Sequence, residues 1–594
     1  MQTYNDTDTD LFCAGFAHLW DGRLLFAGGD GGRKGDNAPL SNTNVYDWRT
    51  NTWRREADMA APRWYASVAA LGNGEMLTLE GSYSPSPVAE VFGLDRAWRP
   101  LDVEGVHAEG DYQWILQVPD GSVMSFGPEN LVASIDTEGA GAIEVLSERD
   151  GAGLRDYGSY AMFEPGRILV AGGGIAQTSA VTIDTASGQV TDAGNMRLPR
   201  RQHNLTILAD GSVLVTGGNA DGAEYYSPDA GVRTPELWDP ATGRFTTLND
   251  SAADRQYHSI ALLLPDGRVL SAGGGLCGEC YRLGYEERNA DLFSPPYLFG
   301  ADGEPAVRPV LANVPPVADY GQAISLVTDA VGVSRAHLIK LGAPTHSENQ
   351  DQRLVPLAHR ASAGRLELVM PASRHAAPPG HYLLFVVDGA GVPSIGAMVE
   401  LGQPLVRPGE DVAGTLHPGA ADRYLFTANG ALELALVADA PVRLAVARDA
   451  PVGAPGARIA CGSTAAAFAA HRCEVEADGD ARWYASVSGE SSADYRIVAT
   501  GARAADGFGE TVGADPVRAD GAGIVRTGGG GASGAPALFA LGAASFARRR
   551  RALAARPASR SGTGRRDASP EGYTARPRCP SSPDRASRHR RRPR

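Results

Sequence analysis

The chain has 594 residues, of which 43% are hydrophobic, and it contains 73 glycines and 39 prolines. This composition is typical of a turn-rich β protein with several domains and argues against a disordered chain. The formal net charge is −14, although residues 548–594 hold sixteen arginines against three acidic residues. The remaining chain is therefore strongly acidic, which argues against nucleic acid as a partner.

A hairpin turn recurs along the first 304 residues. Each copy centres on a glycine and is followed by a short apolar strand, which in most copies ends in paired glycines, as in residues 24–29 and 213–218. A later strand in most copies carries an aromatic residue, such as Trp53 or Phe245. The turn glycines, spaced 45 to 56 residues apart, are Gly22, Gly74, Gly121, Gly166, Gly211 and Gly267.

This period predicts an all-β fold that begins with a kelch-type β-propeller over residues 1–304. A repeat near fifty residues with a glycine pair and a later aromatic is the kelch signature. Six repeats are visible in the sequence. We expect seven blades in full, with the seventh completed by sequence that precedes Met1.

The repeats align a second set of residues, nine positions before each turn glycine. Equivalent positions in successive blades lie on one ring around the axis, so their side chains should crowd one pole of the channel. None of them is aliphatic. The mouth of a propeller is polar even where it holds no site. The shared register alone therefore supports a simple polar mouth and a chemical site equally. These six start residues are Cys13, Tyr65, Tyr112, Tyr157, Gln202 and His258.

After residue 304 the period disappears, and shorter apolar or alternating strands follow, separated by proline and glycine turns. Residues 305–402 are predicted to form an immunoglobulin-like β-sandwich. Residues 403–501 are predicted to form a further small β domain, which resembles sandwiches of the prepeptidase C-terminal type. Residues 502–533 form a linker rich in glycine and alanine.

The end of the chain is predicted to be a sorting tail. An apolar run of about fourteen residues within 534–551 is short for a membrane span, and it ends in the arginines at 548–551. Glycines, apolar run and arginine cluster together resemble a bacterial C-terminal sorting segment. Residues 552–594 are low-complexity and basic, which favours an anchor over nucleic-acid binding. We expect a secreted or cell-surface protein whose C-terminal tail interacts with sorting machinery, although no signal peptide is visible at Met1.

Six cysteines are too few for a disulfide scaffold. Cys277 with Cys280, and Cys461 with Cys473, are close enough in sequence for local bridges, which indicates an oxidising compartment. The first pair could also bind a metal, but the lack of a second such pair favours a disulfide.

Five short motifs resemble those of the copper radical oxidases, the family of galactose oxidase and glyoxal oxidase. The resemblance covers approximately residues 8–402. The motifs are Leu11-Phe12-Cys13, Arg63-Trp64-Tyr65, Tyr257-His258, Gly275-Leu276-Cys277-Gly278-Glu279-Cys280 and Pro344-Thr345-His346.

The resemblance implies one copper ion and a self-processed cofactor. In the family a cysteine is joined by a thioether to a tyrosine that holds a radical, and Cys13 and Tyr65 match this pair. Tyr257 matches the second tyrosine, an axial ligand and base. The expected metal ligands are Tyr65, Tyr257, His258 and His346, with His346 in a loop that the sandwich inserts into the propeller channel. Imidazole and phenolate donors suit Cu(II).

Neighbouring strand residues normally point to opposite faces. Tyr257 and His258 can therefore reach one metal only if they lie at an irregular strand start.

The resemblance also implies an activity, with substrate oxidised first and O2 then reduced to H2O2. Tyr83 matches the aromatic that the family stacks over the thioether, and we expect it to line the substrate pocket with Tyr112, Tyr157 and Gln202. The pocket departs from that of galactose oxidase, so we expect a primary alcohol or a small aldehyde as substrate rather than galactose. The alternative is a catalytically silent kelch propeller that binds glycans or surfaces, with a carbohydrate as its partner.

Overall fold

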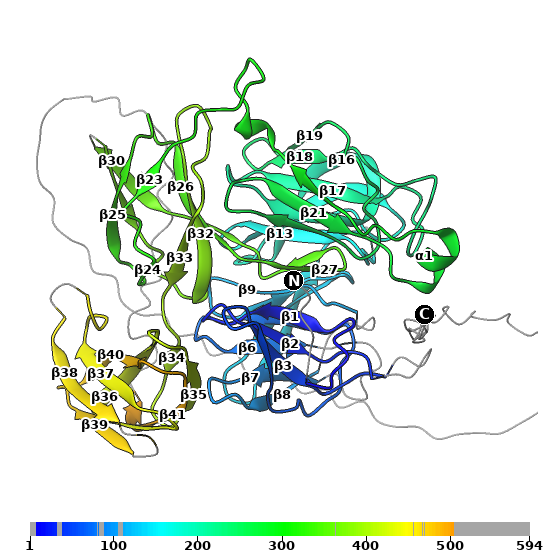
Figure 1. Cartoon of the computed structure of the whole chain (residues 1–594). Helices are drawn as coiled ribbons and strands as arrows, with labels where there is room; N and C mark the ends of the chain where they lie inside the picture. Colours follow the sequence, from blue (N-terminus) through cyan, green and yellow to red (C-terminus); the bar gives the residue numbers. More distant parts are fainter. Residues whose placement is uncertain are drawn as a thin grey trace, which may run out of the picture. The chain divides into compact units, whose positions relative to one another are not determined.

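The computed structural model describes residues 7–503 except 32–37, 80, 82–87, 105–110, 152, 363, 455–456, 466 and 468–469. The described part is almost entirely β, which confirms the predicted class; it has one α-helix, α1 (Gly278–Leu283), and one 3-10 turn, η1 (Pro296–Leu298) (Figure 1). No helix within it is long and apolar enough to cross a membrane. Tyr83, the predicted apolar segment and the basic tail lie outside the described residues.

The repeat region (residues 8–304) consists of antiparallel sheets whose strands follow one another along the chain. Repeats 1 to 3 have four strands each. Their strands are β1 (Gly15–His18), β2 (Leu24–Ala27), β3 (Thr43–Asp47) and β4 (Thr52–Arg55); β5 (Ser67–Ala70), β6 (Met76–Leu79), β7 (Val88–Phe92) and β8 (Trp98–Glu104); and β9 (Ile115–Gln117), β10 (Val123–Ser125), β11 (Leu131–Asp136) and β12 (Ala142–Glu148).

Repeats 4 and 5 share one seven-stranded sheet, because the long strand β16 (Gln189–Ile207) ends one repeat and begins the next. The other strands of this sheet are β13 (Ser159–Glu164), β14 (Arg167–Ala171), β15 (Gln177–Asp184), β17 (Val213–Asn219), β18 (Glu236–Asp239) and β19 (Arg244–Thr247). Repeat 6 has β20 (Ser259–Leu263), β21 (Val269–Gly273) and β22 (Ala290–Phe293). Closure of these sheets into a propeller, and a seventh blade, stay predictions.

The turn glycines connect the first two strands of each repeat, and the second domain packs closely against several of them. All six have positive φ, between 75° and 98°, a conformation that suits glycine. A Cβ atom on Gly22 would lie 2.9 Å from His381 Cε1, and one on Gly121 would lie 3.2 Å from His375 Nε2. Glycine is therefore required at these turns both for the backbone conformation and for the close packing.

Buried arginines hold neighbouring strands together two residues before several of the start residues. Arg63 Nη2 lies 2.9 Å from Glu90 Oε1, and Arg200 Nη2 lies 2.8 Å from Glu236 Oε1, with all four side chains buried. Arg155 occupies the same position before Tyr157 and pairs with Asp150 at 2.9 Å. Arg63 and Arg200 form equivalent pairs, each with a glutamate on the third strand of its repeat, whereas Arg155 pairs with a residue that precedes it.

The second domain consists of two sheets that enclose a hydrophobic core, with Leu326, Leu338 and Leu384 among its buried side chains. Two-sheet packing agrees with the predicted sandwich, while its immunoglobulin type stays a prediction. One sheet holds β23 (Leu311–Ala312), β25 (Ala323–Thr328), β31 (Arg365–Val369) and β30 (Ala358–Ser362). The other holds β24 (Val317–Ala318), β33 (Ala397–Leu401), β32 (Gly380–Val387), β26 (Arg335–Lys340) and β29 (Leu354–Pro356).

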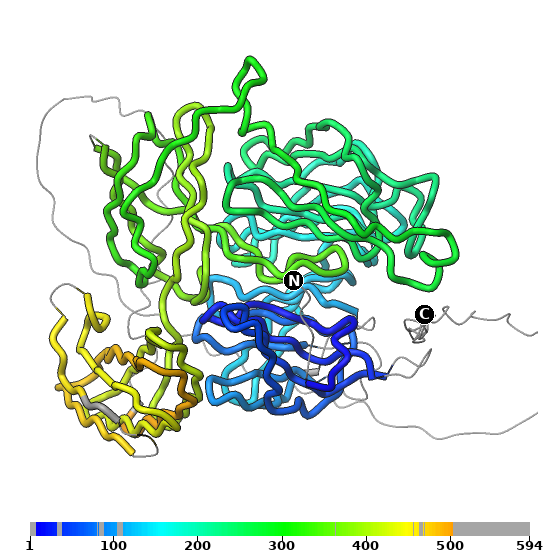
Figure 2. The backbone as a smooth tube through the Cα atoms, viewed as in Figure 1, coloured from blue at the N-terminus to red at the C-terminus, as the bar shows by residue number. Residues whose placement is uncertain are grey.

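Between β26 and β29 the second domain extends a hairpin made of β27 (Ala343–Thr345) and β28 (Glu348–Gln350). This hairpin contacts the first strands β1, β5, β13, β16 and β20 of five repeats. Figures 1 and 2 show it lying between the sheets of repeats 1 to 3 and those of repeats 4 to 6. A segment of the second domain is thus surrounded by the repeat region.

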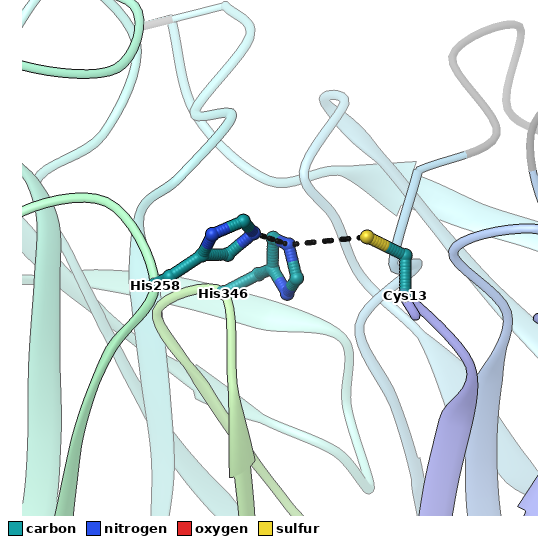
Figure 3. A group of neighbouring side chains, drawn as sticks. All are labelled: Cys13, His258 and His346. Carbon is teal, nitrogen blue, oxygen red and sulfur yellow. Dashed lines mark hydrogen bonds between the residues drawn. The ribbon is translucent and has the colours of Figure 1, made fainter. Parts of the chain in front are cut away.

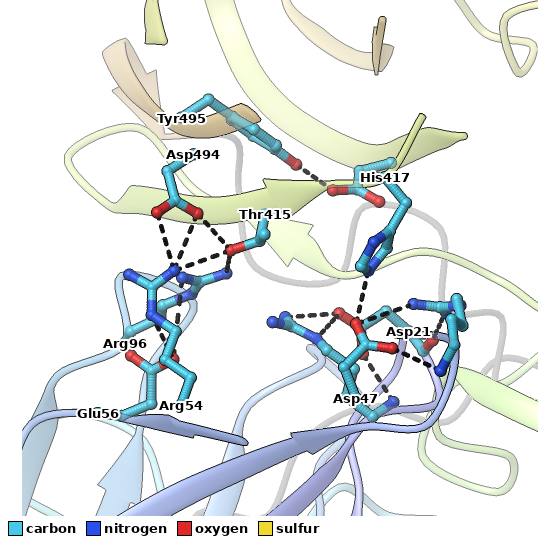
Figure 4. Close-up of polar contacts among 12 residues, drawn as sticks. Asp21, Asp47, Arg54, Glu56, Arg96, Thr415, His417, Asp494 and Tyr495 are labelled. Carbon is cyan, nitrogen blue, oxygen red and sulfur yellow. Dashed lines mark hydrogen bonds and ion pairs between the residues drawn. The ribbon is translucent and has the colours of Figure 1, made fainter. Parts of the chain in front are cut away.

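The third domain has a core of its own around Leu434, Trp483 and Ile497. Its strands are β34 (Leu405–Val406), β35 (Asp411–Leu416), β36 (Ala421–Ala438), β37 (Val442–Arg448), β38 (Ile459–Ala465), β39 (His471–Val475), β40 (Asp480–Ser488) and β41 (Ala493–Arg503). The predicted Cys461–Cys473 disulfide is present. Polar residues of this domain contact repeat 1, where Asp494 pairs with Arg54 and His417 contacts Asp47, and repeat 2, where Thr415 accepts from Arg96 (Figure 4).

Candidate metal centre

The six start residues share one unusual backbone conformation. All have positive φ, from 44° at Tyr112 to 64° at His258, a region that residues other than glycine seldom occupy. The N–H of Tyr65 donates to the carbonyl of Cys13 at 2.9 Å, and the N–H of Tyr112 donates to that of Tyr65 at 2.8 Å. The same conformation in every repeat agrees with the register found in the sequence, and it supplies the irregular strand start that Tyr257 and His258 require.

Two histidines and a cysteine from distant parts of the chain meet at one point (Figure 3). The Nε2 atoms of His258 and His346 lie 2.7 Å apart, and Cys13 Sγ lies 3.9 Å from His346 Nε2. The three ligand atoms fall within 4.8 Å of one another. Among the described residues, these three side chains form a group that could hold a metal ion.

Both imidazoles have their second nitrogen occupied, which orients Nε2 toward the shared point. His258 Nδ1 lies 2.7 Å from the carbonyl oxygen of Gly275, which can only accept, so Nδ1 carries the proton. His346 Nδ1 lies 2.8 Å from Thr345 Oγ1. Burial lowers the pKa of His258 to about 4 and that of His346 well below its ordinary value. Both rings are therefore neutral at neutral pH, the form that binds metals.

Two buried tyrosines complete the group. The hydroxyl oxygens of Tyr65 and Tyr257 lie 3.0 Å apart, and the rings of both pack edge-on against His346. Burial, with Tyr257 and Cys13 nearby, raises the pKa of Tyr65 well above its ordinary value. A divalent cation beside a phenol has the opposite effect and favours the phenolate. Tyr65 can therefore act as an anionic ligand only when a metal is bound.

Cys13 lies beside Tyr65, as the thioether prediction requires. The two side chains belong to one buried cluster with Trp64 and Tyr112. The Trp64 ring lies 4.2 Å from the Tyr65 ring, at an interplanar angle of 31°. Trp64 thus covers the Tyr65 ring, a contact that the sequence analysis did not assign.

The predicted pocket residues divide into two groups. Tyr112 lies 4.6 Å from the His346 ring and Tyr157 lies 5.6 Å from the Tyr257 ring, so both border the centre. Gln202 is buried, and its amide donates to the carbonyl of Glu224 and accepts from Asn219 Nδ2 at 3.2 Å. These bonds hold the loop between β17 and β18; a role for Gln202 in substrate binding stays a prediction.

That loop brings Tyr225 to 4.9 Å from the Tyr257 ring. Tyr225 was not predicted from the sequence because it lies outside the repeat register. The signal that could have found it is the Tyr225-Tyr226 pair in an otherwise polar loop.

The predicted Cys277–Cys280 disulfide is also present and lies at the start of α1. It follows Gly275, whose carbonyl orients His258. The disulfide therefore fixes the segment that sets the orientation of one candidate ligand.

Comparison with known proteins agrees with the motifs. Residues 176–297 match the family model "Glyoxal oxidase N-terminus", and residues 308–401 match "Galactose oxidase-like, Early set domain". Galactose oxidase of Gibberella zeae is 30% identical over 436 residues, which cover 68% of this chain and 62% of the relative. Aldehyde oxidase GLOX of Vitis pseudoreticulata is 28% identical over 441 residues, covering 66% of this chain and 82% of the relative.

A solved structure is similar in both sequence and fold. It is described as a novel fungal alcohol oxidase with catalytic diversity among the AA5 family, in complex with copper. It is 28% identical with a TM-score of 0.61, and the match covers 67% of this chain and 86% of that one. The chain spans about 62% of the length of the galactose oxidase that it matches. Together with the motifs, these matches confirm the predicted resemblance to the family of galactose oxidase and glyoxal oxidase.

Proposed function

We propose that the protein is a mononuclear copper radical oxidase, which oxidises a primary alcohol to an aldehyde, or a small aldehyde to an acid, and reduces O2 to H2O2. The observation that carries this proposal is the convergence of His258 Nε2 and His346 Nε2 beside the paired hydroxyls of Tyr65 and Tyr257. Two imidazole nitrogens and two phenol oxygens form a donor set that suits Cu(II). The residues present therefore fit a copper ion.

Tyr65, Tyr257, His258 and His346 would hold a copper ion that supplies a one-electron acceptor, and Tyr65, joined to Cys13 and oxidised, would accept the second electron of the substrate. Tyr257 would take the hydroxyl proton of the alcohol, or of the hydrate that an aldehyde forms with water, because its phenol lies at the centre of the site and is bordered by Tyr157 and Tyr225. These rings restrict water around the reacting atoms. The electrons and protons taken from the substrate would then pass to O2, which balances the reaction.

Several broader features belong to the same proposal. We infer that the repeat region is a closed kelch-type propeller of seven blades in full and that the second domain is of the immunoglobulin type. The protein would act outside the cell or at its surface. The aromatic border of Tyr112, Tyr157 and Tyr225 supports a small alcohol or aldehyde as substrate.

The test is a peroxide-coupled screen of primary alcohols, sugars and small aldehydes on purified, copper-loaded protein. We expect one copper per chain and peroxide release with at least one substrate class. The His346→Ala variant, prepared in parallel, should release none. Protein that neither retains copper nor releases peroxide would contradict the proposal and favour the silent, glycan-binding alternative.

A further inference from the structure

The candidate ligand His346 lies at a strained turn. His346 and Ser347 connect β27 to β28 and have φ of 45° and 74°. A two-residue hairpin turn with positive φ at both positions normally uses asparagine or glycine. Residues held in such conformations persist where the surrounding structure over-determines them. The support for this turn must therefore come from the rest of the hairpin.

Gln352 forms that support on one side of the hairpin. Its Oε1 accepts from the N–H of Ile207 at 3.2 Å, and its Nε2 donates to the carbonyls of Leu205 at 2.9 Å and Tyr160 at 3.2 Å. The amide thus pairs with the inner edge of β16 as the peptide group of a neighbouring strand would, and it also reaches β13. Since buried backbone groups must be paired, this arrangement specifies one depth of insertion.

Neighbouring residues of the hairpin add to the same attachment. Gln350 Oε1 accepts from the N–H of Val68 in β5 at 3.3 Å. Arg353 Nη1 donates to the carbonyl of Gln117 in β9 at 3.0 Å, and Asp351 pairs with both Arg353 and Lys340. The hairpin and the residues that follow it to Arg353 are therefore bonded to the first strands of four repeats, at positions that lie close in sequence to His346.

We propose that Gln352 is a positioning residue for His346. His258 belongs to the repeat region and His346 to the second domain, so the distance between their Nε2 atoms depends on how deeply the hairpin is inserted. The Gln352 amide fixes that depth by bonds that a shifted hairpin could not make. This inference rests on the proposed copper site, since the consequence of the positioning is metal binding.

The experiment compares two variants. Gln352→Met keeps the length of the side chain and removes its amide, and Gln189→Met changes an exposed glutamine on β16, the strand to which Gln352 bonds. Cu(II) affinity is measured by competition with a chelator, and the Cu(II) environment by electron paramagnetic resonance. We expect Gln352→Met to bind copper about 10- to 100-fold more weakly, the range found for residues that orient metal ligands, with an altered spectrum. Gln189→Met should match the wild type.

A purely structural role for Gln352 would lower the melting temperature and leave the copper spectrum and affinity of the folded protein unchanged; that result would overturn the proposal. If Gln352→Met does not fold, Gln352→Asn, which keeps an amide but shortens its reach, is judged by the same criteria. Hydrogen exchange of residues 343–353 in metal-free protein gives a readout that does not require copper. A wild type that binds no copper would sink the proposed function, whereas unchanged exchange in the variant would sink the positioning role.

Discussion

The repeat region is contacted in two very different ways by the parts of the chain that follow it. The hairpin β27–β28 and residues 351–353 are buried and bond mostly to backbone groups of the first strands. The third domain instead meets repeat 1 through side-chain contacts, such as the half-exposed ion pair of Arg54 Nη1 with Asp494 Oδ1 at 2.9 Å and the contact of His417 Nε2 with Asp47 Oδ2 at 2.5 Å (Figure 4).

The two kinds of contact differ in how strictly they fix the geometry of their partners. Backbone-directed bonds in a buried site accept one geometry, because a shifted partner leaves polar groups unpaired at a cost of about 1–3 kcal/mol each. Exposed ion pairs contribute about 0–1 kcal/mol and tolerate small displacements. The hairpin is therefore suited to hold a metal ligand, whereas the third domain is suited to dock.

Repeats 1 and 2 contribute both to the candidate metal centre and to the docking contact with the third domain. They supply Cys13 and Tyr65 at one end, where the proposed thioether would join them covalently. Away from the start residues, the third domain bridges the same two repeats, with the N–H of Ala413 donating to Leu94 at 2.8 Å beside the charged pairs.

The largest expected effect is that of His346→Ala. The variant removes a ligand itself rather than a residue that supports one, so copper affinity should fall by more than the roughly 100-fold that marks the upper end for supporting residues. The measurement is copper titration with circular dichroism to confirm that the β fold remains. Copper affinity equal to that of the wild type would remove His346 from the site.

Cys13→Ser should abolish the thioether and, with it, oxidase activity. Wild-type protein exposed to copper and O2 should lose the mass of a pair of hydrogens and show altered mobility on a reducing gel. The variant should show neither change, because serine cannot form the bond. A thiol at Cys13 that still reacts with an alkylating reagent in active, copper-loaded wild type would contradict the prediction.

Asp351→Asn should destabilise the hairpin. Asp351 lies between Lys340 and Arg353, and all three side chains are at most 2% exposed. Removing the carboxylate leaves two buried cations without their counter-charge, so the free energy of unfolding should fall by about 3–5 kcal/mol. Denaturant unfolding measures it. A loss below about 1 kcal/mol, which is typical of exposed pairs, would mean that water reaches this group.

Arg54→Ala should have the smallest effect, because the side chains of Arg54 and Asp494 are 45% and 49% exposed. We expect a change of at most about 1 kcal/mol in the free energy of unfolding, which decreases with added salt. Arg472→Ala, which breaks an exposed pair with Glu433 inside the third domain, is the matched control. A markedly larger loss for Arg54→Ala would show that this interface is as strongly coupled as the hairpin.

The pH dependence of the contact between the third domain and repeat 1 provides a further test. Burial raises the pKa of Asp494, but hydrogen bonds from Thr415 and Arg54 and the charge of Arg54 outweigh it, and the net pKa lies below the ordinary 3.8. A carboxylate with a lowered pKa stabilises the fold above its unfolded pKa and loses that contribution as pH falls through the folded value. Hydrogen exchange in β35 and β41 should therefore rise only in strong acid. Equal exchange in wild type and Asp494→Asn across this range would remove Asp494 from the interface.

The β class, the six start residues and both disulfides could be predicted from the sequence. These features depend on local spacing: a turn glycine with positive φ fixes the position nine residues earlier, and the paired cysteines are 3 and 12 residues apart. The motifs also named His346, although nothing in their spacing showed where the hairpin inserts.

Only the tertiary structure brought together residues with no common period. Gln352 and Leu205 are 147 residues apart, and Tyr225 reaches Tyr257 from a loop outside the register. The buried pair of Arg200 with Glu236 and the docking of the third domain are of the same kind. Such contacts depend on how deeply one domain inserts into another and on which backbone groups are left unpaired there. The spacing of residues along the chain predicts neither of these.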